Sequence, residues 1–207
     1  MNIEEGVKII SVYDNIVDYI LVKQGAKINA VGTPDKPIVM TSEKEEPGAW
    51  GGIHICGKAH TNAEGGKGSS EIGGAVYGGN DDADNSGTLQ YIRLEYTGFA
   101  FDEEHEANGI SFYGVGNGTI VDHCEAYKGS DDGFEFFGGS VNVSNMVVVS
   151  CSDDSFDWTE GWNGKGTDLV AYQEAKATLG YDCDCLIEAD NNENDNAAVS
   201  YTHLRAH

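Results

Sequence analysis

Apolar and acidic residues alternate in two matching segments near the middle of the chain. Gly129-Ser-Asp-Asp-Gly-Phe-Glu-Phe-Phe137 returns as Cys151-Ser-Asp-Asp-Ser-Phe-Asp-Trp-Thr159, and Asp131 and Asp153 are 153 − 131 = 22 residues apart. Alternation with a period of two indicates strands with one buried face. A repeat of about this length, with short strands and Gly, Asn and Asp at the corners, is typical of stacked coils. We therefore predict an all-β parallel solenoid.

Alignment of the repeats predicts which side chains point into the solenoid. One inward ladder contains Ile92, Leu94, Cys124, Ala126, Met146 and Val148. A second contains Ile110, Phe112, Phe134, Phe136, Phe156 and Trp158. Residues between the inward positions should face solvent, so we expect an outward column of His54, Ser111, Glu135 and Asp157 with neighbours about 4.8 Å apart.

The rest of the chain fits a single domain over residues 1–198. Short strands are predicted at 7–12, 19–22, 26–30, 37–41 and 49–56, separated by glycines. The Gly-, Ser-, Asn- and Asp-rich segment 57–86 is too long for a corner and is expected to form an inserted lateral loop. Residues 199–207 are neither acidic nor periodic. They resemble the translation of a sequencing adapter, so they are excluded from the fold prediction.

The charge of the chain is strongly negative, at −23 from 35 acidic and 12 basic residues. Nucleic acids and anionic membranes are disfavoured as partners because phosphate binding needs a basic surface. Divalent cations are the natural counter-charge, although most of the carboxylates are expected only to keep the surface soluble. No signal peptide or membrane-spanning run is present, and because the chain opens directly in a strand we expect the native N-terminus to be missing.

Several strings together resemble one protein family. They are Trp50-Gly-Gly-Ile53, Tyr77-Gly-Gly-Asn-Asp81, Asn108-Gly-Ile-Ser-Phe-Tyr-Gly-Val-Gly116 and Ser130-Asp-Asp-Gly-Phe-Glu-Phe-Phe-Gly-Gly139. They are similar to exported, often lipid-anchored bacterial proteins with a right-handed, pectin-lyase-like β-helix. The resemblance covers about residues 3–192 and implies that fold, with a secreted or outer-membrane surface location and a lipid anchor on a missing N-terminal region. It implies truncation at both ends and no assigned activity.

Paired carboxylates on adjacent coils suit glycoside hydrolysis, which uses one carboxyl group as an acid and a second as a base or nucleophile. Glu135, Asp153 and Asp157 are the candidate catalytic residues. The alternative is that aspartates at the corners cap backbone N–H groups. Lyase chemistry on a uronate is disfavoured because Arg93 is expected to pair with a neighbouring acid, which leaves Lys128 and Lys165 as the candidate bases, and because the negative chain repels a polyanion.

Calcium is the expected cofactor, and two groups of residues could bind it. Asp82, Asp84 and Ser86 form a D-x-D-x-S-G run like the first half of a calcium loop. Asp131, Asp132 and Asp154 lie at stacked corners, where like charges need a cation. An oxygen-rich turn at 190–195 is a further candidate, and Asx-turn chemistry is the structural alternative for these loops.

Aromatic residues beside the acidic column could hold sugars, because an aromatic ring next to carboxylates suits a neutral sugar. Tyr113, Phe137 and Trp162 are the candidates. We therefore expect a surface module that binds carbohydrate or mediates adhesion, with polysaccharide hydrolysis as the alternative. A deep cleft that converges on Glu135, Asp153 and Asp157 would favour catalysis, whereas a flat column would favour binding.

Overall fold

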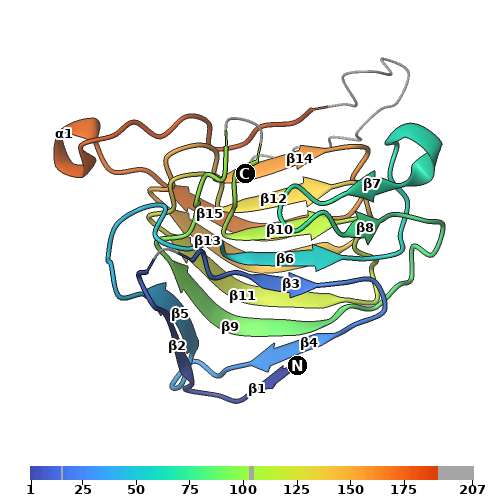
Figure 1. Ribbon diagram of the computed structural model, residues 1–207, viewed down its shortest axis with the longest axis horizontal. Coiled ribbons are helices and arrows are strands. Elements are labelled where there is room, and N and C mark those ends of the chain that lie inside the picture. Colours follow the sequence, from blue (N-terminus) through green and yellow to red (C-terminus); the bar gives the residue numbers. More distant parts are fainter. Residues whose placement is uncertain (15, 103–104, 191–207) are drawn as a thin grey trace.

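The computed structural model describes residues 1–14, 16–102 and 105–190 as a right-handed parallel β-helix (Figure 1). One sheet, sheet B, stacks short strands in the order β14-β12-β10-β6-β3. Sheet A stacks longer strands in the order β1-β4-β9-β11-β13-β15, with β5 paired to β9 and β2 paired to β5. From β9 onwards the chain alternates between the two sheets, so each of these coils contributes one strand to sheet A and one to sheet B.

The strands of sheet B are β3 (Ile20–Val22), β6 (Ile53–Cys56), β10 (Ile110–Tyr113), β12 (Phe134–Phe137) and β14 (Phe156–Thr159). Sheet A contains β1 (Asn2–Ile3), β2 (Lys8–Ser11), β4 (Ile28–Val31), β5 (Ile38–Ser42), β9 (Gly87–Glu95), β11 (Ile120–Tyr127), β13 (Asn142–Val149) and β15 (Gly166–Tyr172). A short helix α1 (Lys176–Leu179) follows β15.

The register between coils confirms the predicted repeat. Phe134 pairs with Phe156 and Glu135 with Asp157 across β12 and β14. The aligned inward residues are buried, from Phe134 at 0% exposed to Trp158 at 5%. Their apolar faces are covered by neighbouring coils, so the core is continuous along the solenoid. Further predicted pairs that the structure confirms are Ile110–Phe134, Phe112–Phe136, Ile92–Cys124, Leu94–Ala126 and Ala126–Val148.

A residue with positive φ lies within each long strand of sheet A, at the same step of every coil. Tyr91, His123, Asn145 and Asp168 have φ values between 50° and 54°. Side chains rarely adopt this conformation without local support. Here Tyr91 stacks on His123 at 4.4 Å between ring centroids, and Asn145 donates a hydrogen bond to Asp122. The four residues form a bend ladder that turns each long strand across two faces of its coil.

The segment 57–86 leaves the solenoid as a lateral loop. It contains a 3-10 turn η1 (Glu64–Gly66) and a small antiparallel pair of β7 (Gly68–Ser69) and β8 (Val76–Tyr77). In Figure 1 this pair lies beside the strands of sheet B. Tyr77 and Ala75 of the loop pack against Cys56, Tyr113 and Phe137 of that sheet. The loop therefore covers the outer face of sheet B.

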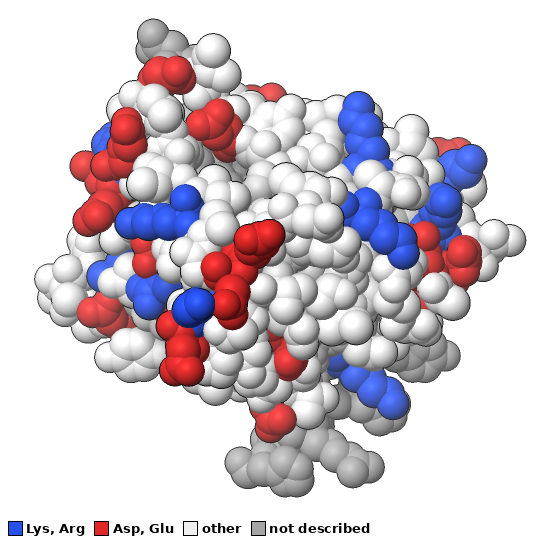
Figure 2. Space-filling view, turned by 90° about the horizontal axis from the view of Figure 1, so that it is seen from below, with Lys and Arg blue, Asp and Glu red and all other residues white. Residues whose placement is uncertain are grey.

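The surface seen from below in Figure 2 carries basic and acidic side chains interspersed over a largely uncharged face. No helix within the described part of the chain is long and apolar enough to cross a membrane. The adapter-like tail at 199–207 lies outside the described residues, as does the end of the oxygen-rich turn beyond Asp190.

Candidate functional site

The predicted outward column is covered rather than open to solvent. His54 and Ser111 are 0% exposed, Asp157 is 9% exposed, and Glu135 is half-buried. The pairing that defines the column is confirmed, but the prediction that it faces solvent is wrong. Several segments lie against it: Tyr19 and Tyr113 pack on the His54 ring, and Glu71 of the lateral loop accepts a hydrogen bond from the Tyr113 hydroxyl at 3.2 Å.

The three aromatic candidates are also buried, which corrects the expectation that they form an open platform. Trp162 turns inward, stacks on Phe136 at 4.6 Å and donates its indole N–H to the Val141 carbonyl oxygen. Tyr113 and Phe137 stack at 4.4 Å beneath Tyr77 of the lateral loop. These rings are part of the apolar core and of the packing under the lateral loop. A ligand at the column would therefore contact carboxylates rather than aromatic rings.

The segment after α1 adds a further coil to sheet B and extends the column. Glu188 donates its backbone N–H to the Phe156 carbonyl oxygen at 3.0 Å, which places Glu188 beside Asp157. Asp184 donates in the same way to the Asp153 carbonyl oxygen at 3.2 Å. Sequence reasoning missed both acids because this coil is longer, with 184 − 153 = 31 and 188 − 157 = 31. An alignment of 182–190 on 151–159 at that offset would have found them.

Carboxyl groups from four neighbouring coils meet in an inner hollow of about 210 Å³. All three candidate catalytic residues, Glu135, Asp153 and Asp157, contribute to it, so the expected convergence is observed. The hollow is lined by Glu71, Glu106, Asp131, Asp132, Glu135, Asp153, Asp157 and Glu188. Among the described residues no lysine or arginine lines it, so its field attracts cations and repels anions.

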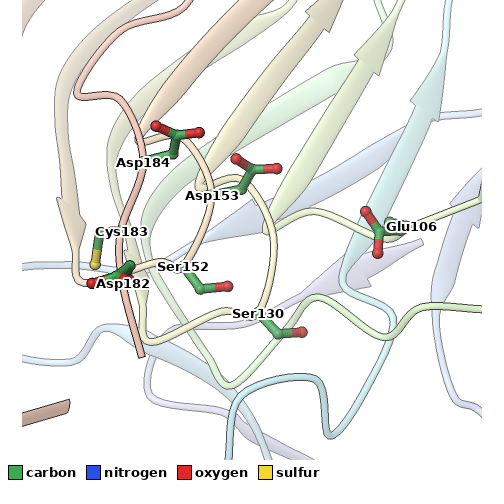
Figure 3. A pocket seen from close by; sticks show the side chains of 7 residues that line it. All are labelled: Glu106, Ser130, Ser152, Asp153, Asp182, Cys183 and Asp184. Atoms are coloured by element: carbon green, nitrogen blue, oxygen red, sulfur yellow. The ribbon is translucent and has the colours of Figure 1, made fainter. Parts of the chain in front are cut away.

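An outer hollow of about 460 Å³ shares Glu106 and Asp153 with the inner one. Figure 3 shows Asp153 and Asp184 close together on one side of this space and Glu106 on the other. Carboxylate and hydroxyl oxygens dominate its lining, which also includes Ser130, Ser152, Asp182 and Cys183. The two hollows together are called the acidic cleft below.

Two corner aspartates hold the backbone of the next coil. Asp132 accepts a hydrogen bond from the Asp154 N–H at 2.9 Å, and Asp154 accepts one from the Cys185 N–H at 2.7 Å. This is the capping role weighed against catalysis in the sequence. Each cap uses the Oδ1 atom of its aspartate. The caps fix both side chains, and Asp132 lines the inner hollow.

Burial and mutual repulsion raise the carboxyl pKa values in the inner hollow. Burial, followed by the charge of Asp132, holds the pKa of Glu135 well above its usual range. Burial raises the pKa of Asp131 to about 8. Burial also raises the pKa of Asp157 to about 6, although a hydrogen bond with Glu135 opposes the rise. These carboxyl groups therefore hold their protons to a higher pH than exposed acids do. Among the described residues that line the hollow, no lysine or arginine offsets their negative charge.

Several acids converge closely enough to hold a metal ion. One carboxylate oxygen from each of Asp132, Glu135 and Asp157 lies within 4.8 Å of the other two. Three overlapping groups meet the same limit, namely Asp131–Asp132–Asp153, Asp153–Asp154–Asp184 and Asp154–Asp157–Glu188. The predicted ligands Asp131, Asp132 and Asp154 thus lie among these groups, although in different combinations.

The predicted calcium loop lies elsewhere and its carboxylates have protein partners. Asp82 accepts hydrogen bonds from the backbone and ring of His60 at 3.1 and 2.7 Å. Asp84 accepts one from the Lys58 N–H at 3.2 Å and one from the Ser86 hydroxyl at 3.4 Å. Among the described residues, neither acid belongs to a group that could hold a metal. Calcium binding by this loop remains a prediction.

One family model matches residues 1–206, and its description is a pectate-lyase-like β-helix domain. Neither the curated proteins nor the solved structures contain a significant match to the chain. The match agrees with the parallel sheets described above.

Proposed function

Because the chain belongs to the pectate-lyase-like β-helix domain family, a carbohydrate-related fold family, we propose that it binds polysaccharide in the acidic cleft. The observation that carries the proposal is the outer hollow, where oxygens of Ser152, Asp153 and Asp184 can accept hydrogen bonds from sugar hydroxyls. Its volume of about 460 Å³ lies within the range of small-molecule sites, roughly 300 to 1,000 Å³.

The charge of the cleft selects among glycans. A polyuronate would bring its own carboxylates to a surface that contains no lysine or arginine in its lining, and the two would repel. A neutral or amine-bearing polysaccharide meets no such repulsion. We therefore propose neutral or amine-bearing glycans as the ligand class, presented to a protein that is secreted or held on the outer-membrane surface by a lipid anchor.

Hydrolysis is the second candidate, and a specific observation favours it. The inner hollow converges on Glu135, Asp153 and Asp157, and the pKa of Asp157 is raised to about 6, as an acid catalyst requires. Catalysis needs room for a glycosidic bond between the two carboxyl groups, which stand about 5 to 5.5 Å apart in retaining enzymes and about 6.5 to 9.5 Å apart in inverting enzymes. Glu135 and Asp157 instead share a hydrogen bond with each other, so this pair leaves no such room. Binding is therefore the better-supported function.

A glycan array tests the proposal, followed by pull-down on insoluble polysaccharides with reducing-end release measured on every ligand. Asp184→Asn and Ser152→Ala should each weaken binding at least fivefold. Asp168→Asn, at an exposed position of β15, is the control for loss of a carboxylate and should bind like the unchanged chain. Release of reducing ends would establish hydrolysis instead. A chain that binds no glycan, or that binds polygalacturonate best, would overturn the proposed function.

A further inference from the structure

Two aromatic rings remain exposed at the corner of the coils that leads into sheet B. Tyr19, immediately before β3, is 39% exposed, and Phe101, in the connection from β9 to β10, is 42% exposed. Their ring centroids lie 6.1 Å apart at an interplanar angle of 82°, and Phe99 packs on Phe101 at 5.0 Å. These three residues are called the aromatic rim below. Unlike the three buried aromatic candidates, the rim offers ring surface to a ligand.

The solenoid holds both exposed rings in place. The Phe101 N–H donates to the His105 carbonyl oxygen at 2.8 Å, which closes a short antiparallel turn. This turn is anchored on the coil below, because the Phe99 N–H donates to the Trp50 carbonyl oxygen at 3.3 Å. The Tyr19 ring packs edge-on against a buried histidine ring of the column at 6.1 Å. Rings that are positioned before a ligand arrives lose little conformational entropy when it binds.

The aromatic rim and the acidic cleft lie along the same corner of the coils. Tyr19 directly precedes Ile20, and the register of sheet B links Ile20 to Phe156 over four steps, through β6, β10, β12 and β14 (Figure 1). Asp153 occupies the corner before Phe156, and Glu106, in the same turn as the rim, lines both hollows. Adjacent strands lie about 4.8 Å apart, so the two corners are about 19 Å apart along the solenoid axis. The rings and the acids therefore form one track.

We propose that the aromatic rim is a second sugar subsite, on which one pyranose ring of a polysaccharide stacks while the acidic cleft holds units further along the same chain. The inference rests on the proposed glycan function. The C–H face of a pyranose is apolar, so it gains from contact with an exposed aromatic ring, while its hydroxyl groups remain available to the carboxylates. Because a single sugar cannot span about 19 Å, the ligand is a chain of several neutral or amine-bearing units that runs along the solenoid axis.

Calorimetric titration with a hexasaccharide and a disaccharide, each from cellulose and from chitosan, tests the subsite. Phe101→Ala and Tyr19→Ala should each weaken hexasaccharide binding about fivefold, the order of magnitude of one stacking contact, and leave disaccharide binding within twofold. Phe101→Tyr keeps a ring and should restore hexasaccharide binding. Asp184→Asn should weaken both lengths. The matched control is Tyr172→Ala, which removes a ring that is 60% exposed on sheet A and should bind both lengths like the unchanged chain.

Three results would overturn the subsite and leave the proposed glycan function standing. The first is unchanged hexasaccharide binding in both rim variants while Asp184→Asn loses it. The second is an equal loss for both lengths in the rim variants, which would show a general disturbance of the cleft. The third is binding on the glycan array by a chain that binds neither hexasaccharide. A chain that binds no glycan at all would overturn the proposed function together with the subsite. Far-ultraviolet circular dichroism of each variant checks that the fold is retained.

Discussion

The two faces of β12 and β14 differ in how their side chains are satisfied, although the residues alternate along the same strands. On the inner face Phe134 stacks on Phe156 at 5.8 Å, and both rings belong to the buried apolar core. On the outer face Glu135 lies beside Asp157 among further acids, and Asn108 donates a hydrogen bond to Glu135. The first face is stabilised by the burial of apolar surface, whereas the second brings carboxyl groups together. Mutations on the two faces should therefore change stability with opposite signs.

The largest effect is expected on the inner face. Phe134→Ala should lower the free energy of unfolding by about 3 to 5 kcal/mol, because it removes a fully buried ring and leaves a cavity. Urea denaturation measures the loss. Val170→Ala, at a position that is 53% exposed on β15, should cost less than about 1 kcal/mol. A Phe134→Ala loss as small as that of the control would contradict an interior position.

Calcium is expected to stabilise the fold by offsetting the repulsion between the acids of the outer face. An ion that binds only the folded chain adds about 2.7 kcal/mol to the free energy of unfolding at a hundredfold excess over Kd. The measurement is a thermal melt with calcium chloride, compared with sodium chloride at the same ionic strength. No difference between the two salts would remove coordination from the explanation.

Neutralising one acid of the outer face should stabilise the calcium-free chain. The pKa of Asp157 is raised from 3.8 to about 6, so its ionised form destabilises the fold above pH 6. Each pKa unit corresponds to about 1.4 kcal/mol, so Asp157→Asn should raise the free energy of unfolding by up to about 3 kcal/mol at pH 8. Urea denaturation in EDTA measures this change. A destabilised variant would show that the carboxylate is satisfied without a ligand.

The acids of the lateral loop provide the sharpest contrast with those of the cleft. Asp84→Ala should lower the free energy of unfolding by about 1 kcal/mol, because it removes the acceptor for the Lys58 N–H and the Ser86 hydroxyl. Its stabilisation by calcium should match that of the unchanged chain. A lost calcium response in Asp84→Ala, measured by thermal melt, would move the ion from the cleft to the loop.

The register of the solenoid was predictable because the repeat length and the alternation of apolar and acidic residues determine it. Phe134 and Phe156 occupy the same step of a 22-residue repeat, and parallel pairing places equivalent residues side by side. A shift of one residue would have exposed the aromatic ladder, so burial allowed one solution. The bend ladder was not predicted, because Tyr91 rarely adopts positive φ and because His123, Asn145 and Asp168, although more often found there, also occur in ordinary strands.

The cover over the outer face was not predictable from the repeat. Alternation specifies which side of a strand a residue occupies, but not whether another segment lies on that side. Glu71 and Tyr77 come from a lateral loop without periodicity, and Glu188 comes from a coil with a different length. The repeat itself predicted the site residues Glu135, Asp153 and Asp157. It could not predict the acids outside the 22-residue repeat, which are Glu71, Glu106, Asp184 and Glu188.

The bend ladder also bears on how such a chain can evolve. Because Tyr91, His123, Asn145 and Asp168 turn every long strand at the same step, each coil presents the same footprint to the coil above and below it. A tandem duplication of one 22-residue unit would therefore insert between existing coils without changing their shape. Since the inner hollow draws its acids from successive coils, such a duplication would lengthen the acidic column by one coil and would alter the cleft without altering the apolar core.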